Sequence, residues 1–318
     1  MPAASNPLPW LAPGEPFPAV ERAWGARDPA PGLLAAGNAL TVPVLRSAYG
    51  AGIFPWFSDG QPVLWWSPDP RMVLPCAEFR LHRSLRKTVQ RFVEHPGCEV
   101  RIDHDFRAVI TACAGSPRAG QDGTWIVAPM IEAYVALHGA GLAHSVETWV
   151  DGRLVAGLYC VSIGQAVFGE SMFTRVTDGS KIALAALVAF CRQHGPALID
   201  CQQNTRHLAS FGAREIPRAE FVRHVAAAAA RPAPRWHFLP VYWERVLSRD
   251  ALSAASAPMP GGPADGAHAG PSAVSPKAAW HTSPTCRCRP CSSTPRRPIR
   301  AAICRGGRPA RRSPRRAT

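Results

Sequence analysis

Two short stretches decide the expected fold: Phe168-Gly169-Glu170-Ser171-Met172-Phe173 and Leu198-Ile199-Asp200-Cys201-Gln202. In a β-strand, alternate side chains point to the same face. The side chains expected to point together are Phe168, Glu170 and Met172 on the first stretch, and Leu198, Asp200 and Gln202 on the second. Burying a carboxylate without a partner costs several kcal/mol, so acidic groups on such strands need a reason to be there. We therefore take this pair of strands as the candidate site.

The segment between the two strands is expected to be a helix. Its apolar residues follow the i, i+3, i+4, i+7 spacing of a buried helical stripe, at Leu184, Leu187, Val188 and Cys191. Asp178-Gly179-Ser180 offers a turn and an N-cap before the stripe, and Gly195-Pro196 ends it. The unit is then a strand, a crossover helix and a second strand.

The residues before this unit predict an antiparallel meander. Asp151-Gly152 is a strong two-residue hairpin signal, and a second turn at Gly164-Gln165 leads into the strand that bears Glu170. A helix beginning near Pro129 precedes the meander, and its expected buried face is Ile131, Tyr134, Val135 and His138. This order of elements predicts an α+β fold with a mixed sheet like that of the acetyl-CoA-dependent acyltransferases. The analogy concerns the fold alone.

Composition divides the 318 residues into four parts. Residues 1–18 are a Pro-rich N-terminal extension, and residues 19–100 are expected to form a small N-terminal domain. Residues 101–248 are expected to form the acyltransferase-like catalytic domain. Residues 249–318 are rich in Pro, Ala and Arg and show no periodicity, which predicts a disordered basic tail.

The net charge of +14 belongs mostly to this tail. Residues 251–318 contain Lys277 and eleven Arg against the single acid Asp265, a net charge of +11, which leaves +3 for the rest. No apolar run approaches the roughly 18 residues of a membrane span, and the N-terminus lacks the apolar core of a signal peptide. Isolated cysteines such as Cys113 and Cys160 are typical of small buried hydrophobes. We therefore expect a cytoplasmic protein without a membrane partner.

Two features of the N-terminal domain each have two interpretations. The tryptophans Trp56, Trp65 and Trp66 are favoured as core residues, but the alternative is a platform on which a nucleobase stacks. Residues 80–92 form an amphipathic helix whose basic side chains are either solvated or in contact with a phosphate backbone. The basic side chains of that helix are Arg83, Arg86, Lys87 and Arg91.

The sequence predicts neither a metal nor a cofactor. Cys286, Cys288, Cys291 and Cys304 lack the paired spacing and structured surroundings of a zinc site. His144 and His207 are interpreted as hydrogen-bonded polar residues. Gly179-Ser180-Lys181 does not match a P-loop, and the helix start has one Gly where CoA-binding folds have a Gly-rich turn.

Seven short motifs resemble those of the leucyl/phenylalanyl-tRNA–protein transferases, in one order over residues 18–245. They are Gly32-Leu33-Leu34-Ala35, Gly52-Ile53-Phe54-Pro55-Trp56-Phe57, Trp65-Trp66-Ser67-Pro68-Asp69-Pro70-Arg71, Gly123-Thr124-Trp125-Ile126, the two strand stretches quoted above, and His207-Leu208-Ala209-Ser210 with Gly212-Ala213. The chain departs from the family at Asn38-Ala39, where Gly-Asp is usual, and in the tail, which has no counterpart.

The resemblance implies an aminoacyltransferase that moves Leu or Phe, and weakly Met, from Leu-tRNA or Phe-tRNA to proteins beginning with Lys or Arg, which marks them for degradation. It implies that Asp200 holds the attacking amine, that Gln202 orients it or the ester carbonyl, and that Glu170 hydrogen-bonds the substrate or supports the pair. The substrate contacts that it implies are Trp56 and Trp125 at the terminal adenosine, Leu158, Val167, Met172 and Ser171 at the aminoacyl group, and Arg83, Arg86, Lys87 and Arg91 at the tRNA backbone.

Two alternatives remain open from the sequence. One is a CoA-dependent N-acyltransferase on the same fold, which the missing Gly-rich turn disfavours. The other is a non-enzymatic RNA-binding protein that acts through its basic tail. The small net charge of residues 1–250 disfavours this reading, because any specific nucleic-acid contact of the folded part is then local.

Overall fold

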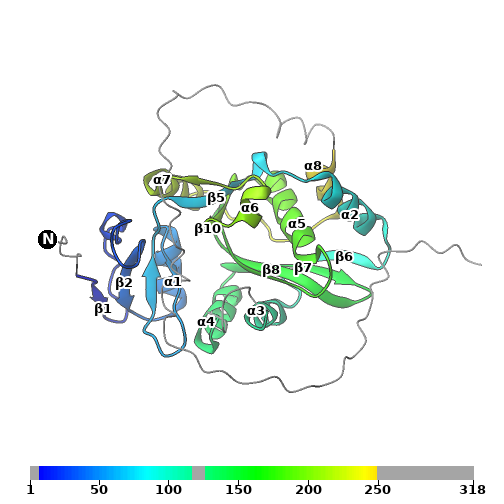
Figure 1. Cartoon of the computed structure of the whole chain (residues 1–318). Helices are drawn as coiled ribbons and strands as arrows, with labels where there is room; N and C mark the ends of the chain where they lie inside the picture. The colour runs from blue at the N-terminus through cyan, green and yellow to red at the C-terminus, as the bar shows by residue number, and fades with distance from the viewer. Residues whose placement is uncertain (1–6, 117–125, 249–318) are drawn as a thin grey trace, which may run out of the picture. The chain divides into compact units, whose positions relative to one another are not determined.

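The computed structural model describes residues 7–116 and 126–248, which form two β-sheets with helices around them (Figure 1). The smaller sheet has the strand order β1-β2-β4-β3. Its elements are β1 (Trp10–Leu11), η1 (Val20–Arg22), β2 (Leu33–Gly37), α1 (Val42–Gly50), β3 (Phe54–Pro55) and β4 (Leu64–Trp66). Trp65 and Trp66 are buried, so both are core residues of this sheet.

The larger sheet of the described residues has the strand order β11-β5-β10-β9-β8-β7-β6. Its strands are β5 (Arg71–Pro75), β6 (Cys98–Ile102), β7 (Ala143–Val150), β8 (Arg153–Ile163), β9 (Ala166–Thr174), β10 (Leu198–Gln202) and β11 (Arg214–Ile216). β7, β8 and β9 form the predicted antiparallel meander, and β10 runs parallel to β9. The predicted α+β fold with a mixed sheet is therefore confirmed.

The turn chemistry of this sheet follows the sequence. Asp151 and Gly152 both have positive φ values, 49° and 71°, as the favoured two-residue hairpin turn requires. The crossover helix α5 (Gly179–His194) ends at Gly195, whose φ is 106° and whose N–H donates to the carbonyl of Cys191 at 2.9 Å. Both turns were predicted and both are confirmed.

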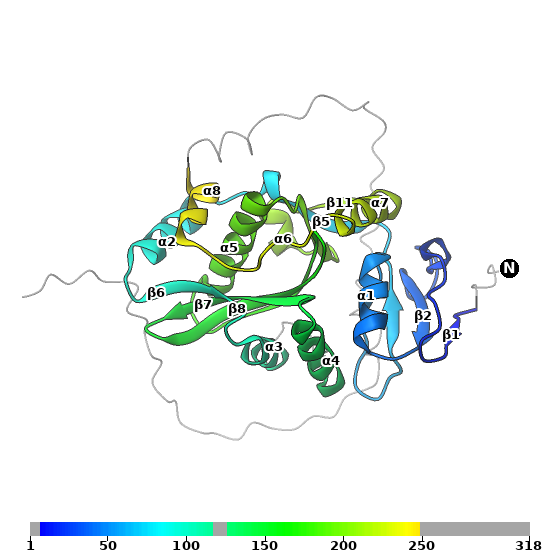
Figure 2. The same cartoon turned by 180° about the vertical axis from the view of Figure 1, so that it is seen from behind.

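Helices cover both faces of the larger sheet (Figures 1 and 2). On one face α5 packs with α2 (Arg83–Glu94), η2 (Cys76–Glu78), η3 (Pro240–Trp243) and α8 (Glu244–Leu247). On the other face lie α3 (Phe106–Ala114), α4 (Ala128–Gly139), α1 and α7 (Arg218–Ala229). We call the two hydrophobic clusters the α5-side core, which includes Leu158 and Val167, and the α4-side core, which includes Tyr134 and Phe168. The short helix α6 (Arg206–Ser210) follows β10.

Helix α4 buries a different face from the one expected. Its buried residues are Met130, Ala133, Tyr134 and Leu137, while Ile131, Val135 and His138 are only partly buried. The expected face is therefore wrong except at Tyr134. Apolar side chains surround most of this helix, so their spacing does not specify which side packs against the sheet.

Part of the predicted N-terminal domain contributes to the larger sheet. β5 pairs with β10 and with β11, and β6 pairs with β7. All described residues lie within one compact unit of the chain. In residues 7–116 and 126–248, no helix has the length and apolar character needed to cross a membrane.

Candidate active site

The candidate site lies where β9 and β10 run side by side, and an irregularity in β9 shapes it. Tyr159 of β8 pairs with Ser171, whereas the next residue, Cys160, pairs with Gly169, so Glu170 is the extra residue of a bulge. Phe168 therefore packs in the α4-side core, while Met172 packs against the α5-side core. The expectation that Phe168, Glu170 and Met172 point together is wrong, because the bulge reverses the alternation.

The carboxylate of Glu170 receives hydrogen bonds from three other elements. The hydroxyl of Tyr49, from α1, donates to its Oε1 at 2.7 Å, and the hydroxyl of Tyr134, from α4, donates to its Oε2 at 3.4 Å. The amide of Gln202, from β10, donates to Oε1 at 3.1 Å. The two tyrosine hydroxyls also lie within hydrogen-bonding distance of each other, and because each has a single proton, all three contacts are hydrogen bonds at once only when Glu170 is protonated. These three described partners of the carboxylate are all neutral groups.

This environment raises the pKa of Glu170 to about 7. Burial is the largest cause, and the nearby Asp200 charge raises the pKa further, while the hydrogen bonds from Tyr49, Gln202 and Tyr134 lower it. Burial also holds the pKa values of Tyr49 and Tyr134 well above their usual range, so both remain hydroxyl donors. Glu170 can therefore gain and release a proton near neutral pH.

Asp200 differs from Glu170 because it is paired with a cation. Its side chain is 1% exposed, and Arg71 of β5 donates from Nε to Oδ1 at 2.8 Å and from Nη2 to Oδ2 at 2.6 Å. Oδ1 also accepts the backbone N–H of Gln202 at 2.9 Å. Both oxygens of Asp200 thus accept hydrogen bonds within the protein. The alternation of side chains along β10 does not predict these partners.

Gln202 has a backbone conformation that only the structure reveals. The register of β10 against β5 shifts between Asp200 and Gln202, and Gln202 has a φ of 61°. A residue other than Gly rarely adopts this left-handed conformation. As a result the Gln202 side chain reaches Glu170, while Asp200 meets Arg71.

The aminoacyl-pocket candidates divide between the two faces of the sheet. Leu158 and Val167 are each 3% exposed in the α5-side core, and the partly buried Met172 packs against the same core, so the structure brings these three together. Ser171 pairs with Tyr159, a residue of the α4-side core, and lies on the Glu170 face. The strands of the sheet separate the two groups.

Comparison with known proteins identifies the family. The profile of the leucyl/phenylalanyl-tRNA protein transferases matches residues 73–226, and that of their N-terminal domain matches residues 38–69. The chain belongs to this family.

The leucyl/phenylalanyl-tRNA–protein transferase of Polaromonas sp. strain JS666 is 65% identical over 245 residues, which are 77% of this chain and 96% of the relative. Those of Albidiferax ferrireducens and Burkholderia multivorans are 58% and 61% identical over 78% and 73% of this chain, and 97% and 91% of their own. Glu170, Asp200 and Gln202 all lie in the matched segment of this transferase.

Of the two tryptophans expected at the adenosine, the structure describes Trp56. Trp56 is partly buried beside the smaller sheet, packs edge-on against Trp66 at 5.3 Å, and accepts the Trp66 indole N–H on its backbone carbonyl at 2.7 Å. Trp125 lies outside the described residues. A stacking role for the pair in this transferase stays a prediction.

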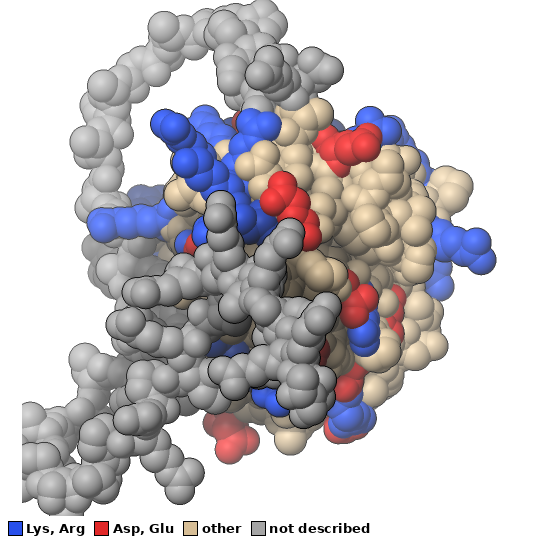
Figure 3. Space-filling view, turned by 90° about the vertical axis from the view of Figure 1, so that its right-hand side faces the viewer, with Lys and Arg blue, Asp and Glu red and all other residues tan. Residues whose placement is uncertain are grey.

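The basic helix α2 exposes most of the expected cations. Leu85, Val89 and Phe92 form its buried stripe, as predicted, and Arg83, Lys87 and Arg91 are exposed. Figure 3 shows Lys and Arg side chains near the upper edge of the side that carries α2 and α8, with acidic side chains close by. Arg86 is instead partly buried and donates to the backbone carbonyl of Leu247. It therefore holds α8 to α2, and three cations remain free to meet a tRNA.

A cluster of metal-ligating residue types lies near the far edge of the larger sheet, at Asp103, His138 and His144. These groups bond to the protein itself. Nδ1 of His144 lies 2.7 Å from Asp103 Oδ2, the Ser145 N–H donates to Asp103 Oδ1 at 2.8 Å, and Nδ1 of His138 donates to the Ala143 carbonyl at 2.8 Å. A metal would have to displace these hydrogen bonds, so we assign none to this transferase.

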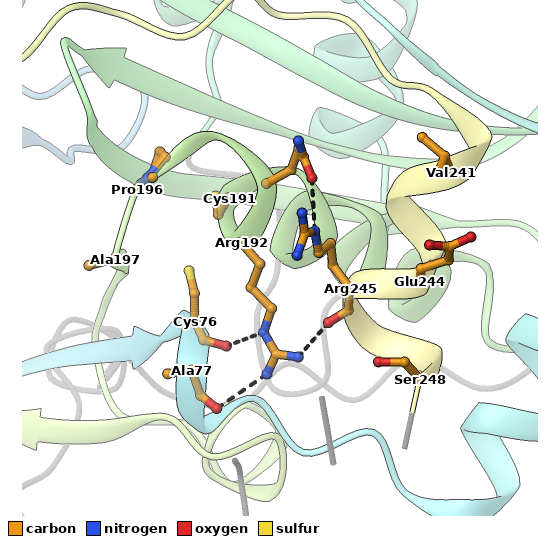
Figure 4. A pocket seen from close by; sticks show the side chains of 12 residues that line it. Cys76, Ala77, Cys191, Arg192, Pro196, Ala197, Val241, Glu244, Arg245 and Ser248 are labelled. Atoms are coloured by element: carbon orange, nitrogen blue, oxygen red, sulfur yellow. Dashed lines mark hydrogen bonds between the residues drawn. The ribbon is translucent and has the colours of Figure 1, made fainter. Parts of the chain in front are cut away.

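A surface pocket of about 660 Å³ lies between η2, the end of α5 and α8 (Figure 4). Arg192 crosses its floor and donates to the carbonyls of Cys76, Ala77 and Arg245 at 2.7, 3.2 and 2.7 Å. Burial holds the pKa of the Cys191 thiol there well above its usual range, so that thiol is unreactive. The pocket lacks Glu170, Gln202 and Asp200, and Arg192 joins α5 to η2 and α8.

The sequence analysis missed three residues of the site, Tyr49, Tyr134 and Arg71. Tyr134 and Arg71 lie in a helix and a motif that the sequence indicates, but none of the three was assigned to the site. The available signal was chemical: two buried acids on neighbouring strands require donors. The composition does not specify which of the many hydrogen-bond donors in the chain bonds to these two acids.

Proposed function

We propose that this enzyme transfers Leu or Phe, and weakly Met, from aminoacyl-tRNA to the N-terminal amine of proteins that begin with Lys or Arg, marking them for degradation. Membership of the transferase family supports the donor and the reaction class. The observation that carries the proposal is the carboxyl of Glu170, which sits among neutral donors with a pKa of about 7.

The chemistry requires a proton to leave the acceptor amine. An N-terminal amine attacks the ester carbonyl of the aminoacyl-tRNA only in its neutral form; the new C–N bond forms, the C–O bond to the terminal ribose breaks, and a proton reaches the leaving ribose oxygen. The ester is already activated, so positioning and proton transfer are the main tasks of the enzyme. A carboxyl that titrates near neutral pH suits both proton steps, and Glu170 is that group.

The remaining residues have supporting roles in this proposal. Gln202 orients the amine or the ester carbonyl beside Glu170, and Asp200, whose carboxylate is paired with Arg71, holds Gln202 in place. Of the residues expected at the aminoacyl group, Ser171 shares the face of Glu170, whereas Leu158, Val167 and Met172 are candidates for an apolar pocket on the opposite, α5-side face. Trp56 and Trp125 are candidates for the adenosine.

The tRNA backbone is proposed to meet α2. Arg83, Lys87 and Arg91 are the candidates with exposed charges, whereas Arg86 acts through its bond to Leu247. Contacts of this kind position the RNA and contain no base information.

Incubation with Leu-tRNA and a peptide beginning with Arg tests the proposal. We expect a leucylated peptide by mass spectrometry, and no product from the same peptide with an acetylated N-terminus. Transfer from acetyl-CoA instead of Leu-tRNA would favour the CoA-dependent alternative. Binding of tRNA without any transfer would leave an RNA-binding protein and refute the enzyme.

A further inference from the structure

Arg71 is buried at the start of β5 and contacts one residue of the candidate site directly, Asp200. Its side chain is 1% exposed, and its guanidinium lies between the rings of Phe54 and Phe221, 4.7 and 4.6 Å from their centroids. Nη1 donates to the carbonyl of Gly52 at 3.3 Å. The position of this cation is therefore fixed from several sides.

The other two guanidinium nitrogens of Arg71, Nε and Nη2, connect it to the site through Asp200. They bind its two carboxylate oxygens at 2.8 and 2.6 Å, and one of these oxygens also accepts the backbone N–H of Gln202 at 2.9 Å. That N–H belongs to the residue with the left-handed backbone at the β10 irregularity. The same residue sends its side-chain amide to Glu170 at 3.1 Å. Arg71, Asp200, Gln202 and Glu170 thus form one continuous chain of hydrogen bonds.

We propose that Arg71 is a positioning residue of the transferase: it holds Asp200 so that Gln202 keeps its left-handed backbone and its amide against Glu170. The inference rests on the proposed function, in which Glu170 and Gln202 face the substrate. Arg71 does not touch the substrate and acts only through Asp200 and Gln202.

Only an arginine satisfies all of these contacts together. Its planar fork donates two parallel hydrogen bonds to one carboxylate while a third nitrogen reaches Gly52, and its flat faces stack on the two rings. A lysine keeps the charge but cannot form the paired bonds. Asp200 would then rotate, and the Gln202 N–H would lose its acceptor.

The test compares Arg71→Lys with Arg218→Lys. Arg218 is a matched control because it is also largely buried, at 13% exposure, and lies 4.0 Å from a carboxylate, that of Asp69, but has no bond to Asp200. We expect Arg71→Lys to lower kcat for transfer at least about tenfold, with KM for aminoacyl-tRNA unchanged within about twofold. We expect Arg218→Lys to stay within about twofold of the wild type in both parameters.

A double-mutant cycle with Gln202→Ala separates positioning from general support of the fold. If Arg71 acts through Gln202, Arg71→Lys lowers kcat much less in the Gln202→Ala background than in the wild type. Equal losses in the two backgrounds overturn the proposal. Should Arg71→Lys not fold, Asp200→Asn weakens the same bonds from the other end and enters the same cycle.

A second measurement does not depend on activity. Losing the Gln202 donor should move the midpoint of Glu170 titration, followed through the pH dependence of unfolding, to higher pH in Arg71→Lys. Tyr49, Tyr134 and Cys160 also face or influence Glu170 and are unchanged in this variant, and Asp200 keeps its charge although its carboxylate rotates. An unmoved midpoint refutes the positioning role. A wild-type enzyme that does not transfer Leu refutes the proposed function instead, and Arg71 is then judged on this midpoint alone.

Discussion

Replacing Glu170 by Gln should remove a pH dependence of stability that the wild-type protein has. The folded state raises the pKa of Glu170 from 4.5 to about 7, so the folded chain holds this proton more tightly than the unfolded chain does. The resulting stabilisation is fully present below about pH 4.5 and is lost as the pH rises through about 7. A difference of about 2.5 pH units corresponds to about 3 kcal/mol in the free energy of unfolding.

Urea unfolding at a series of pH values measures this effect. Glu170→Gln removes this one carboxyl, so the difference between the wild type and the variant reports on Glu170. Relative to the variant, the wild type should lose about 2 to 3 kcal/mol between about pH 5 and pH 8. Glu132→Gln is the matched control, because Glu132 is an exposed glutamate paired with Arg107 and should leave the wild-type pH dependence nearly unchanged.

Parallel curves for the wild type and Glu170→Gln would refute the reasoning, because Glu170 would then have an ordinary pKa. The same carboxyl should also control catalysis. We expect the rate of transfer to change with a midpoint near pH 7, and we expect Glu170→Gln to abolish that midpoint along with most of the activity.

Two further predictions follow from the contacts of the site and of α2. Tyr49→Phe should move the Glu170 midpoint to higher pH and do so more than Tyr134→Phe, because the Tyr49 hydroxyl donates at 2.7 Å and that of Tyr134 at 3.4 Å; the pH series above measures both. Lys87→Ala should weaken binding of every tRNA alike and reduce the salt dependence of affinity by about one charge, whereas Arg86→Ala should chiefly lower the melting temperature by freeing α8. Equal salt slopes for wild type and Lys87→Ala would show that the face of α2 is merely solvated.

The order of elements could be predicted because local signals specify it. Asp151-Gly152 predicts a two-residue hairpin turn and Gly195 predicts the end of a helix. The structure has the hairpin turn at Asp151-Gly152 and the end of α5 at Gly195. The apolar stripe of α2 was equally clear, because its other faces are charged. Helix α4 was predicted in place but with the wrong face, because apolar residues surround it. The spacing of apolar residues thus predicts the buried face of a helix when polar residues occupy its other faces.

The details of the site depend on pairing between strands, which local signals do not contain. The extra residue at Glu170 and the left-handed Gln202 arise from register shifts against β8 and β5, and alternation along one strand cannot reveal them. The partner of Asp200 lies 129 positions earlier in the chain. A buried carboxylate predicts that a donor exists, but only the sheet order β5-β10-β9 identifies Arg71.

The two acids of the site are suited to different tasks by their partners. Asp200 faces a guanidinium that is itself fixed by Gly52 and two aromatic rings, so its charge is matched and its geometry is set. Among the described residues Glu170 accepts hydrogen bonds from two hydroxyls and an amide; burial raises its pKa to about 7, and the nearby charge of Asp200 adds to the rise. In the proposed function Glu170 is the proton carrier, and Asp200 keeps its neighbour Gln202 in place. Arg71 would then support the chemistry of Glu170 from a distance, because it fixes the Asp200 carboxylate to which the backbone of Gln202 is bonded.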